Sequence, residues 1–245
     1  LIHGRSQQRA EQVLREICGA RVQPKKGMAT FYQADFASLA EVRGLAEAVL
    51  RDRERIDYLV NNAGIGSGTD KNHRQLSHDG FELRFAVNYL AGFLLTRLLL
   101  PRLIESAPAR IVNVSSLGQQ DIDFGDVMLE RGYNGTRAYC QSKLAQIMFT
   151  IDLSHEVDRK RVTANALHPA TYMNTAMVRE SGNSPVSSVE DGADAILKQI
   201  VSEELSGKSG LFFNGQRESR AIAQAYDEDA RAKLKALSMR LTGLS

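Results

Sequence analysis

Apolar positions along this chain fall into two alternating patterns. Short runs rich in Val, Ile and Phe predict buried strands, and longer stretches in which apolar residues recur every three or four positions predict helices. The expected strands are 31–35, 56–60, 110–114, 162–167 and 210–213, and the expected helices are 39–53, 79–103, 138–157 and 189–204. Residues 1–5 have the pattern of the end of a further strand.

Strands that alternate with helices of this length form βαβ units, which give a mainly parallel sheet with helices on both faces. We therefore predict an α/β fold, a doubly wound, Rossmann-like sheet in three layers, as a single domain over residues 1–245. Ligands bind such sheets beyond the carboxyl ends of the strands. Polar or small residues follow these ends at positions 5, 35, 61–64, 116 and 168–170, which predicts a ligand site along this edge.

Composition narrows the class of protein. At 245 residues, with 43% apolar and 24% charged side chains, the chain is typical of a soluble globular domain. A net charge of +2 without a Lys/Arg-rich run argues against nucleic-acid binding. The longest apolar stretch, 90–103, is interrupted by Thr96 and two arginines and is too short to span a bilayer, so we expect a core helix. Cys18 and Cys140 lack a metal-binding spacing, so we expect no metal, free thiols and a cytoplasmic location.

Tyr139 and Lys143 are the strongest chemical signal in the chain. Four residues apart on a helix, their side chains stand on the same face about one turn apart. A neighbouring ammonium would favour the ionised phenol and lower the pKa of Tyr139, which would suit it to move a proton on or off a hydroxyl. The same spacing is common on exposed helices, so its meaning depends on the surrounding motifs.

Further motifs accompany this pair in a fixed order. They are Asn61-Asn-Ala-Gly64, Asn88, Ser116 at the end of a strand, and His168-Pro-Ala170. With Tyr139 and Lys143, this order resembles the short-chain dehydrogenase/reductase family. Residues 116–181 more closely resemble its retinol-dehydrogenase-like branch, including uncharacterised bacterial-type members.

The resemblance implies an oxidoreductase that transfers a hydride between a nicotinamide and a carbonyl or alcohol substrate. In that family Tyr139 would be the general acid/base, and Lys143 would hold the nicotinamide ribose. Ser116 would bind the substrate oxygen, with Ser115 as the alternative. Asn88 would hold a water that relays protons to Lys143, unless it is a helix-interior Asn bonded to nearby backbone.

The resemblance also implies the nicotinamide cofactor and its contacts. The expected cofactor-binding residues are Arg5, Asp35, Phe36, Asn62, Ala63, Gly64, Tyr139, Lys143, Pro169, Ala170 and Thr171. The alternative for Asp35 is a helix N-cap, for which Ser38 is better placed. Asn61 would mainly tie neighbouring strands together. Ala170 stands where the family usually has Gly, so the contacts there depart from the pattern.

Arg5 decides which nicotinamide cofactor is expected. An acidic residue at the end of the second strand would bind the ribose 2′-hydroxyl of NAD, but Gly4 occupies what looks like that position and Arg5 follows it. A guanidinium matches the 2′-phosphate of NADP in charge and in geometry. His3, Ser6 and Arg9 are additional donors. We predict NADP(H) rather than NAD(H), the alternative being that Arg5 is an ordinary surface charge.

One element of the family pattern has no match in residues 1–245. The family carries a first strand and a glycine-rich turn that cradles the cofactor pyrophosphate, ahead of the strand that ends at Arg5. We expect that about 25–35 residues precede this sequence and supply both. The alternative is a truncated protein that binds no cofactor.

The substrate side is defined least by the sequence. An insertion at 121–128 and the segment 171–187 are the expected pocket walls, and their apolar residues favour an apolar carbonyl or alcohol substrate. The alternative to an enzyme is a non-catalytic NADP-sensing or scaffold protein of the same fold. We expect a small-molecule substrate as partner, no nucleic acid and no membrane span. The many apolar residues at 90–103 permit a homo-oligomer. The tail 219–245 has helical spacing and would cover either the site or a partner.

Overall fold

Strands and helices alternate along the chain as expected for a parallel α/β sheet. The computed structural model describes residues 1–18 and 29–244. Its strands are β1 (Ile2–Gly4), β2 (Phe31–Gln33), β3 (Tyr58–Asn61), β4 (Ala109–Val114), β5 (Val162–His168), β6 (Phe212–Asn214) and β7 (Arg217–Ser219). In the described residues they form a parallel pair, β1-β2, and a five-stranded sheet, β3-β4-β5-β6-β7. The doubly wound, mainly parallel fold is confirmed, and its strands divide into two hydrogen-bonded sheets.

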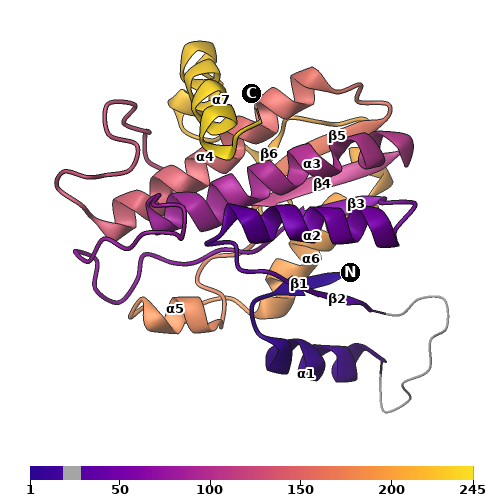
Figure 1. Cartoon of the computed structure of the whole chain (residues 1–245), viewed down its shortest axis with the longest axis horizontal. Coiled ribbons are helices and arrows are strands. Elements are labelled where there is room, and N and C mark those ends of the chain that lie inside the picture. Colours follow the sequence, from indigo (N-terminus) through magenta and orange to yellow (C-terminus); the bar gives the residue numbers. More distant parts are fainter. Residues whose placement is uncertain (19–28, 245) are drawn as a thin grey trace.

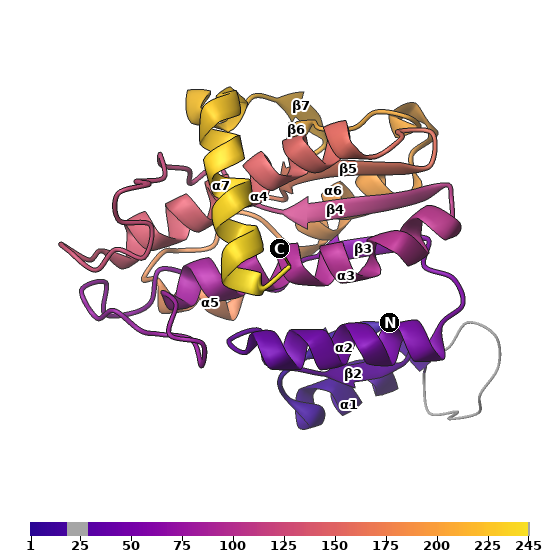
Figure 2. The ribbon, with the colours of Figure 1, turned by 45° about the horizontal axis from the view of Figure 1, so that its top comes forward.

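Helices cover both faces of these strands. They are α1 (Gln7–Cys18), α2 (Leu39–Asp52), α3 (Ala91–Glu105), α4 (Gly135–Glu156), α5 (Ala176–Glu180), α6 (Val189–Val201) and α7 (Glu228–Thr242), with a π-helix η1 (Phe85–Leu90) and short 3₁₀ turns η2 (Glu203–Leu205) and η3 (Ala223–Tyr226). Helices α2, α3 and α4 lie on one face of the strands, and α6 lies on the other (Figures 1 and 2). The strands therefore form the middle of three layers.

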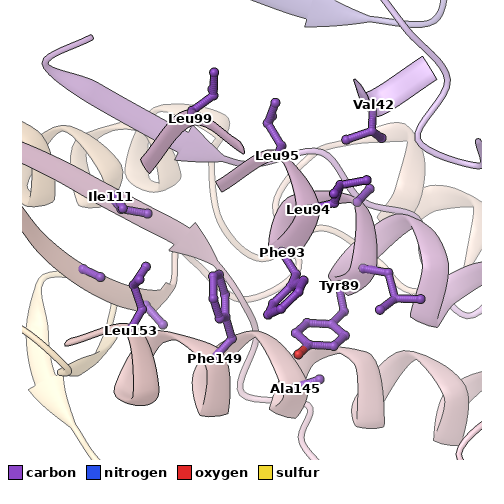
Figure 3. Packing of buried hydrophobic residues seen from close by; sticks show 14 of the residues in the cluster. Val42, Tyr89, Phe93, Leu94, Leu95, Leu99, Ile111, Ala145, Phe149 and Leu153 are labelled. Atoms are coloured by element: carbon purple, nitrogen blue, oxygen red, sulfur yellow. The ribbon is translucent and has the colours of Figure 1, made fainter. Parts of the chain in front are cut away.

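The alternation of side chains along the strands explains the two faces. In β4, Ile111 joins the large core under α3 and α4, whereas its neighbour Val112 joins a smaller cluster under α6. In the large core, Tyr89 and Phe93 pack toward Phe149 of α4 (Figure 3). The Phe93 and Phe149 rings meet edge to face, with 4.9 Å between their centroids.

A chain of buried polar side chains ties the layers together. Asn61 at the end of β3 donates to Thr96 of α3 at 2.9 Å and to Asn113 of β4 at 2.8 Å. Asn113 in turn donates to Thr150 of α4 at 2.8 Å. All four side chains are buried, so these bonds fix two strands and two helices in one register. The expectation that Asn61 joins neighbouring strands is confirmed.

The helix expected at 79–103 begins later and is not uniformly α-helical. Helical geometry begins at residue 83, because Gly80 takes a φ of 83° and Leu76 forms a bridge with Glu82. Residues 85–90 are then wound as a π-helix before α3 continues to Glu105. A π turn holds one residue more than an α turn, so it changes the direction in which Asn88 points.

The same segment is apolar as well as long. Among the described residues, Phe85–Glu105 has the length and hydropathy to cross a membrane, with a mean hydropathy of 1.3 over an 18-residue window. A helix in the core of a soluble protein meets both criteria, and 56% of this window is buried against the rest of the chain.

The C-terminal part of the chain forms elements that the sequence analysis missed or left open. β7 turns back antiparallel on β6, and α7 packs against α4. Ser238 of α7 shares a 2.7 Å hydrogen bond with the buried Tyr89 hydroxyl, and Arg231 pairs with Asp152 of α4 at 2.7 Å. The described residues of the tail pack on the α3 and α4 face of their own chain (Figure 1), which is neither of the two alternatives given for it.

The polar chain predicts a specific loss of stability. Asn113→Leu keeps the side-chain size but leaves the Thr150 hydroxyl with one fewer partner and Asn61 with an unpaired donor. We expect the free energy of unfolding to fall by about 2 kcal/mol or more, as for buried groups that lose their partners. Urea unfolding measures this. The exposed Asn183→Leu is the control, with an expected change within roughly 0.5 kcal/mol, and equal losses in both variants would contradict the prediction.

Candidate functional site

The four predicted catalytic side chains come together where β3 and β4 end against α4. Gly64 shows how closely two of them approach. A Cβ atom added at Gly64 would lie 3.2 Å from the Asn88 Oδ1 and 3.5 Å from the Lys143 Nζ. The absence of a side chain at this position therefore leaves room for both polar groups beside the turn that follows β3.

The other two candidates, Ser116 and Tyr139, lie close to each other beside Gly118. A Cβ atom there would lie 3.4 Å from the Ser116 Oγ and 3.6 Å from Cε1 of Tyr139. The Gly118 N–H donates to the Ser116 Oγ at 3.0 Å, which orients that hydroxyl. Ser116 and Tyr139 thus face the same space. Cys140, a free thiol as expected, lies at its edge, whereas the Cys18 side chain is outside the described part of the chain.

Ser115 and Ser116 have different environments. The Ser115 hydroxyl donates to the backbone carbonyl of Lys143 at 2.7 Å and is buried, so it joins β4 to α4. Ser116 has no such contact with α4 backbone in the described residues and stands beside Tyr139. The geometry favours Ser116 over Ser115 as the residue that meets a substrate.

Lys143 is fully buried, and its ammonium has fixed partners. Nζ donates to the Val114 carbonyl at 2.9 Å and to the Oε1 of Gln146 at 3.0 Å. It lies 5.8 Å from the centre of the Tyr139 ring. Burial lowers the pKa of Lys143 from 10.5 to about 7. An ammonium has three N–H donors, so two protein acceptors leave one donor for a ligand.

The pKa of Tyr139 differs from the expectation. Burial raises it above its ordinary value, and a hydrogen bond with Ser116 offsets part of that rise. The Lys143 ammonium is turned toward Val114 and Gln146, so it does not lower the pKa of the phenol as the spacing suggested. In this structure Ser116 is the side chain that favours ionisation of Tyr139.

Asn88 bonds to backbone, but to that of Ile65 after β3 and not to that of its own helix. Its Oδ1 accepts from the Ile65 N–H at 2.7 Å, and its Nδ2 donates to the Ile65 carbonyl at 3.1 Å and to the Ser142 Oγ at 2.9 Å. Asn88 therefore holds the turn after β3 against α4. Ser142 was missed by the sequence analysis, and its position between Tyr139 and Lys143 on α4 was the one available signal.

The predicted nucleotide-binding residues at the β1 and β2 ends form a second group. The Arg5 side chain is 67% exposed and its Nη1 lies 3.9 Å from the Asp35 carboxylate. Asp35 accepts from the Ala37 N–H at 2.9 Å, while Ser38 is the N-cap of α2, as expected. Phe36 is buried and stacks on His3 with 4.0 Å between ring centroids. His3 also meets the Ala34 carbonyl at 3.0 Å, so it is already engaged.

The residues after β3 and β5 occupy the same edge of the sheet. Asn62 is exposed and Ala63 and Gly64 are half-buried at the β3 end. After β5, Pro169 is buried, Ala170 is half-buried and Thr171 is exposed. His168 shares a 3.0 Å hydrogen bond with the Thr171 hydroxyl, which fixes the start of the next loop. No hydrogen bond or ion pair in the described residues joins this edge to Arg5.

Residues 171–187 form a closed loop that carries α5. The Val186 N–H donates to the Tyr172 carbonyl at 2.9 Å, and Met173 forms a bridge with Ser187. Tyr172 takes a left-handed φ of 43° at the turn. Met177 of α5 lies against Gly66, since a Cβ added there would be 3.0 Å from the Met177 Cγ. The loop therefore stands beside the turn after β3.

A buried ion pair, which sequence reasoning did not find, supports that turn. Arg84 and Glu82 are 2% and 1% exposed, and both bond the Tyr133 hydroxyl, at 2.7 and 3.0 Å. Arg84 also donates to the carbonyls of Gly66 and Ser67 at 3.2 and 3.1 Å. The pair connects the turn after β3 to the start of α4, and no local spacing marks it.

The predicted insertion at 121–128 is held by the C-terminal segment. Gln224 accepts from the Ile122 N–H at 2.7 Å and donates to the Ile122 carbonyl at 3.1 Å. The Ile222 N–H donates to Gln119 at 3.0 Å. The tail thus fixes the segment that follows Ser116, although it lies on the outer face of the helices.

Comparison with known proteins shows which family this sequence matches. The model of the short chain dehydrogenase family matches residues 1–185. Retinol dehydrogenase 13 of Mus musculus is 38% identical over 98% of this chain and 75% of its own length. The Homo sapiens protein of that name is 40% identical over 86% of this chain and 67% of its own length.

Solved structures show the same fold. An uncharacterised protein from Mycobacterium paratuberculosis superposes with a TM-score of 0.72 at 27% identity, over 98% of this chain and 82% of that one. A short chain dehydrogenase from Pseudomonas syringae gives a TM-score of 0.68 at 26% identity, over 87% and 83% of the two chains. The similarity therefore extends over both the sequence and the arrangement of the elements.

The burial of Lys143 predicts a pH-dependent stability. Because its folded pKa of about 7 lies below the ordinary value of 10.5, the unfolded state binds more protons between these values. The resulting destabilisation is absent above pH 10.5 and complete below pH 7. Relative to the parent protein, Lys143→Met should therefore gain stability as the pH falls from about 10 to about 7.

Urea unfolding of both proteins at pH 6, 8 and 10 measures this difference. The exposed Lys160→Met is the matched control and should show no such trend. A difference between Lys143→Met and the parent that is constant across the three pH values would refute the prediction.

Proposed function

The chain belongs to the short-chain dehydrogenase family, and we propose that it transfers a hydride between NADP(H) and a carbonyl or alcohol substrate, with Tyr139 as general acid/base. It is an oxidoreductase, as its family and its retinol dehydrogenase relatives indicate. The observation that carries the proposal is the meeting of the Ser116 hydroxyl, the Tyr139 phenol and the Lys143 ammonium where β4 ends against α4.

Each of these groups has a distinct task in the proposed reaction. Tyr139 gives a proton to the substrate oxygen in reduction and takes one in oxidation. Ser116 hydrogen-bonds that oxygen and stabilises the charge that develops on it. Burial keeps Tyr139 protonated at neutral pH, which suits it as the acid in reduction. Asn88 holds the turn at Ile65 against α4, so it positions the cofactor side relative to Tyr139.

The residues present fit a nicotinamide cofactor. The bound cofactor would supply the hydride acceptor or donor. Lys143 retains one N–H donor for its ribose, and the turn at Ala63 and Gly64 has no bulky side chain to prevent close approach. We propose that Pro169, Ala170 and Thr171 hold the nicotinamide end, and Asn62, Asp35 and Phe36 the adenosine end.

We propose NADP(H) rather than NAD(H) on the basis of Arg5. Its guanidinium is largely exposed, and its only ion pair in the described residues is a long one to Asp35. It is therefore free to meet a phosphate, and no carboxylate of β1 would repel one. The family as a whole uses nicotinamide cofactors, so the choice between the two depends on this end of β1.

We propose an apolar substrate. Met177 of the loop 171–187 lies against Gly66 in the turn after β3, and Leu117 directly follows Ser116. Several apolar side chains in these two segments are exposed. They are Leu117, Tyr172, Met177 and Val186. The relatives named as retinol dehydrogenases favour a long apolar alcohol or aldehyde.

We also propose a cytoplasmic protein in which Phe85–Glu105 is a core helix rather than a membrane span. The support is its packing on the sheet, with α2 on one side and α4 on the other. A homo-oligomer through the outer face of α4 would have to displace α7, which the Arg231–Asp152 ion pair holds there. We therefore expect any oligomer to use another surface.

Tyr139→Phe tests the catalytic proposal. Removal of the hydroxyl leaves the ring in place, so kcat for NADPH-dependent reduction of retinal or smaller aldehydes should fall by about 10²–10⁴-fold. Unfolding temperature and NADPH affinity should change little. The exposed Tyr58→Phe is the control. NADPH binding without any turnover in the parent protein would instead favour the non-catalytic NADP-sensing or scaffold alternative.

Arg5→Glu tests the cofactor proposal. The variant loses a charge-assisted contact and adds repulsion, so the Kd for NADPH should rise by about 10–100-fold while that for NADH changes less. Fluorescence titration with each nucleotide measures both constants, and the exposed Arg15→Glu on α1 controls for net charge. An Arg5→Glu protein that still prefers NADPH would overturn the assignment.

A further inference from the structure

Gln146 is a buried polar side chain that the proposed reaction does not use. It lies one turn beyond Lys143 on α4, within the apolar run from Leu144 to Phe149, and is 4% exposed. Its Oε1 accepts a hydrogen bond from the Lys143 Nζ at 3.0 Å. An ammonium only donates, so the amide oxygen must face Lys143.

The backbone around Gln146 is fixed by the polar chain across the sheet. The Gln146 carbonyl accepts from the Thr150 hydroxyl at 2.7 Å, and that hydroxyl accepts from Asn113 of β4 at 2.8 Å. The second acceptor for Lys143 is the Val114 carbonyl, one residue beyond Asn113. Both acceptors therefore have positions set by the contact between β4 and α4.

The groups that face the Lys143 ammonium are uncharged. They are Gln146 and the Tyr139 phenol on α4, the Val114 carbonyl on β4, Asn88 on η1 and Gly64 after β3. Burial is the cause of its lowered pKa, and no charged group in the described residues opposes that effect. A carboxylate at position 146 would oppose it strongly, since an opposite charge at this distance favours the ammonium.

We propose that Gln146 is a positioning residue for Lys143: its neutral amide oxygen accepts one N–H of the ammonium and holds the Lys143 side chain beside the Val114 carbonyl of β4. This inference rests on the proposed function of Lys143 as the ribose-binding residue. With Gln146 in place, two of the three N–H groups of the Lys143 ammonium donate to protein acceptors. Because these two bonds fix the ammonium, the direction of its third N–H is fixed as well.

Two near-isosteric substitutions of Gln146 should move the pH at which Lys143 loses its proton in opposite directions. Gln146→Glu adds a negative charge about one hydrogen bond away from Nζ, so Lys143 should keep its proton to a pH about one to three units higher. Gln146→Met removes the acceptor and should make Lys143 lose its proton at a lower pH than in the parent. A residue that only filled space would give no downward shift of the Lys143 midpoint in Gln146→Met, so that variant carries the test, and Gln146→Glu checks that position 146 acts on Lys143 at all.

The measurement is an NMR titration of the full chain labelled with ¹³C-lysine, between pH 5 and 11, without nucleotide or substrate. Lys143→Met identifies the resonance. Gln199→Met is the matched control, because Gln199 is also buried but its side chain has no hydrogen-bond partner in the described residues. A Lys143 midpoint that does not move in Gln146→Met or in Gln146→Glu would overturn the proposal.

A second readout separates this inference from the proposed function. The pH profile of NADPH binding in the same variants should move in the same direction as the NMR midpoint. If the midpoint moves while NADPH binding and turnover are absent at every pH, Gln146 still positions Lys143, and the oxidoreductase role proposed for this site is wrong. If both move together, both proposals hold.

Discussion

The hydrogen bonds from Thr96 through Asn61 and Asn113 to Thr150 are the constraint on which the arrangement of the site depends. Each is made between elements far apart in sequence, and each is buried, where an unpaired amide or hydroxyl would be costly. Apolar packing alone would allow α4 to slide along the sheet, because Leu and Ile side chains accept several neighbours. The directional bonds permit one register, and that register places Lys143 opposite Val114 and Tyr139 beside Ser116.

The family and the fold could be predicted from the sequence, and so could the grouping of the four candidate side chains, because their signals are local. Tyr139 and Lys143 are one helical turn apart, and Ser116 directly follows a strand. Gln146 could not be predicted in this way, since its meaning depends on an ammonium held by Val114, 29 residues earlier. The hydrogen bonds of Arg84 could not be predicted either, because the Tyr133 hydroxyl that Arg84 contacts lies 49 residues away in the sequence. The identity of a buried polar partner is a property of the packed structure.

The differences from the sequence expectations have physical causes as well. The spacing of apolar residues indicates that a segment is helical but does not indicate where the helix begins. The predicted start at residue 79 is therefore too early, because Gly80 has a φ of 83° and helical geometry begins after it. Side-chain proximity on a helix predicts that Lys143 and Tyr139 are neighbours, but not where the ammonium points. The backbone carbonyl of Val114 and the amide of Gln146 are better acceptors than the face of a phenol ring, and burial then dominates the pKa of Tyr139.

The π-helical turn at Phe85–Leu90 has a consequence for how this fold can vary. Insertions and deletions are tolerated in loops, but within a helix each one rotates everything beyond it by about 100°. Here the extra residue of the π turn points Asn88 at Ile65 and Ser142, while Phe93 and Leu94 beyond it still face the core. A one-residue deletion that restored a regular α-helix would disturb either the polar contacts or the apolar face. This segment should therefore keep its length among related sequences even where most of its residues are exchanged.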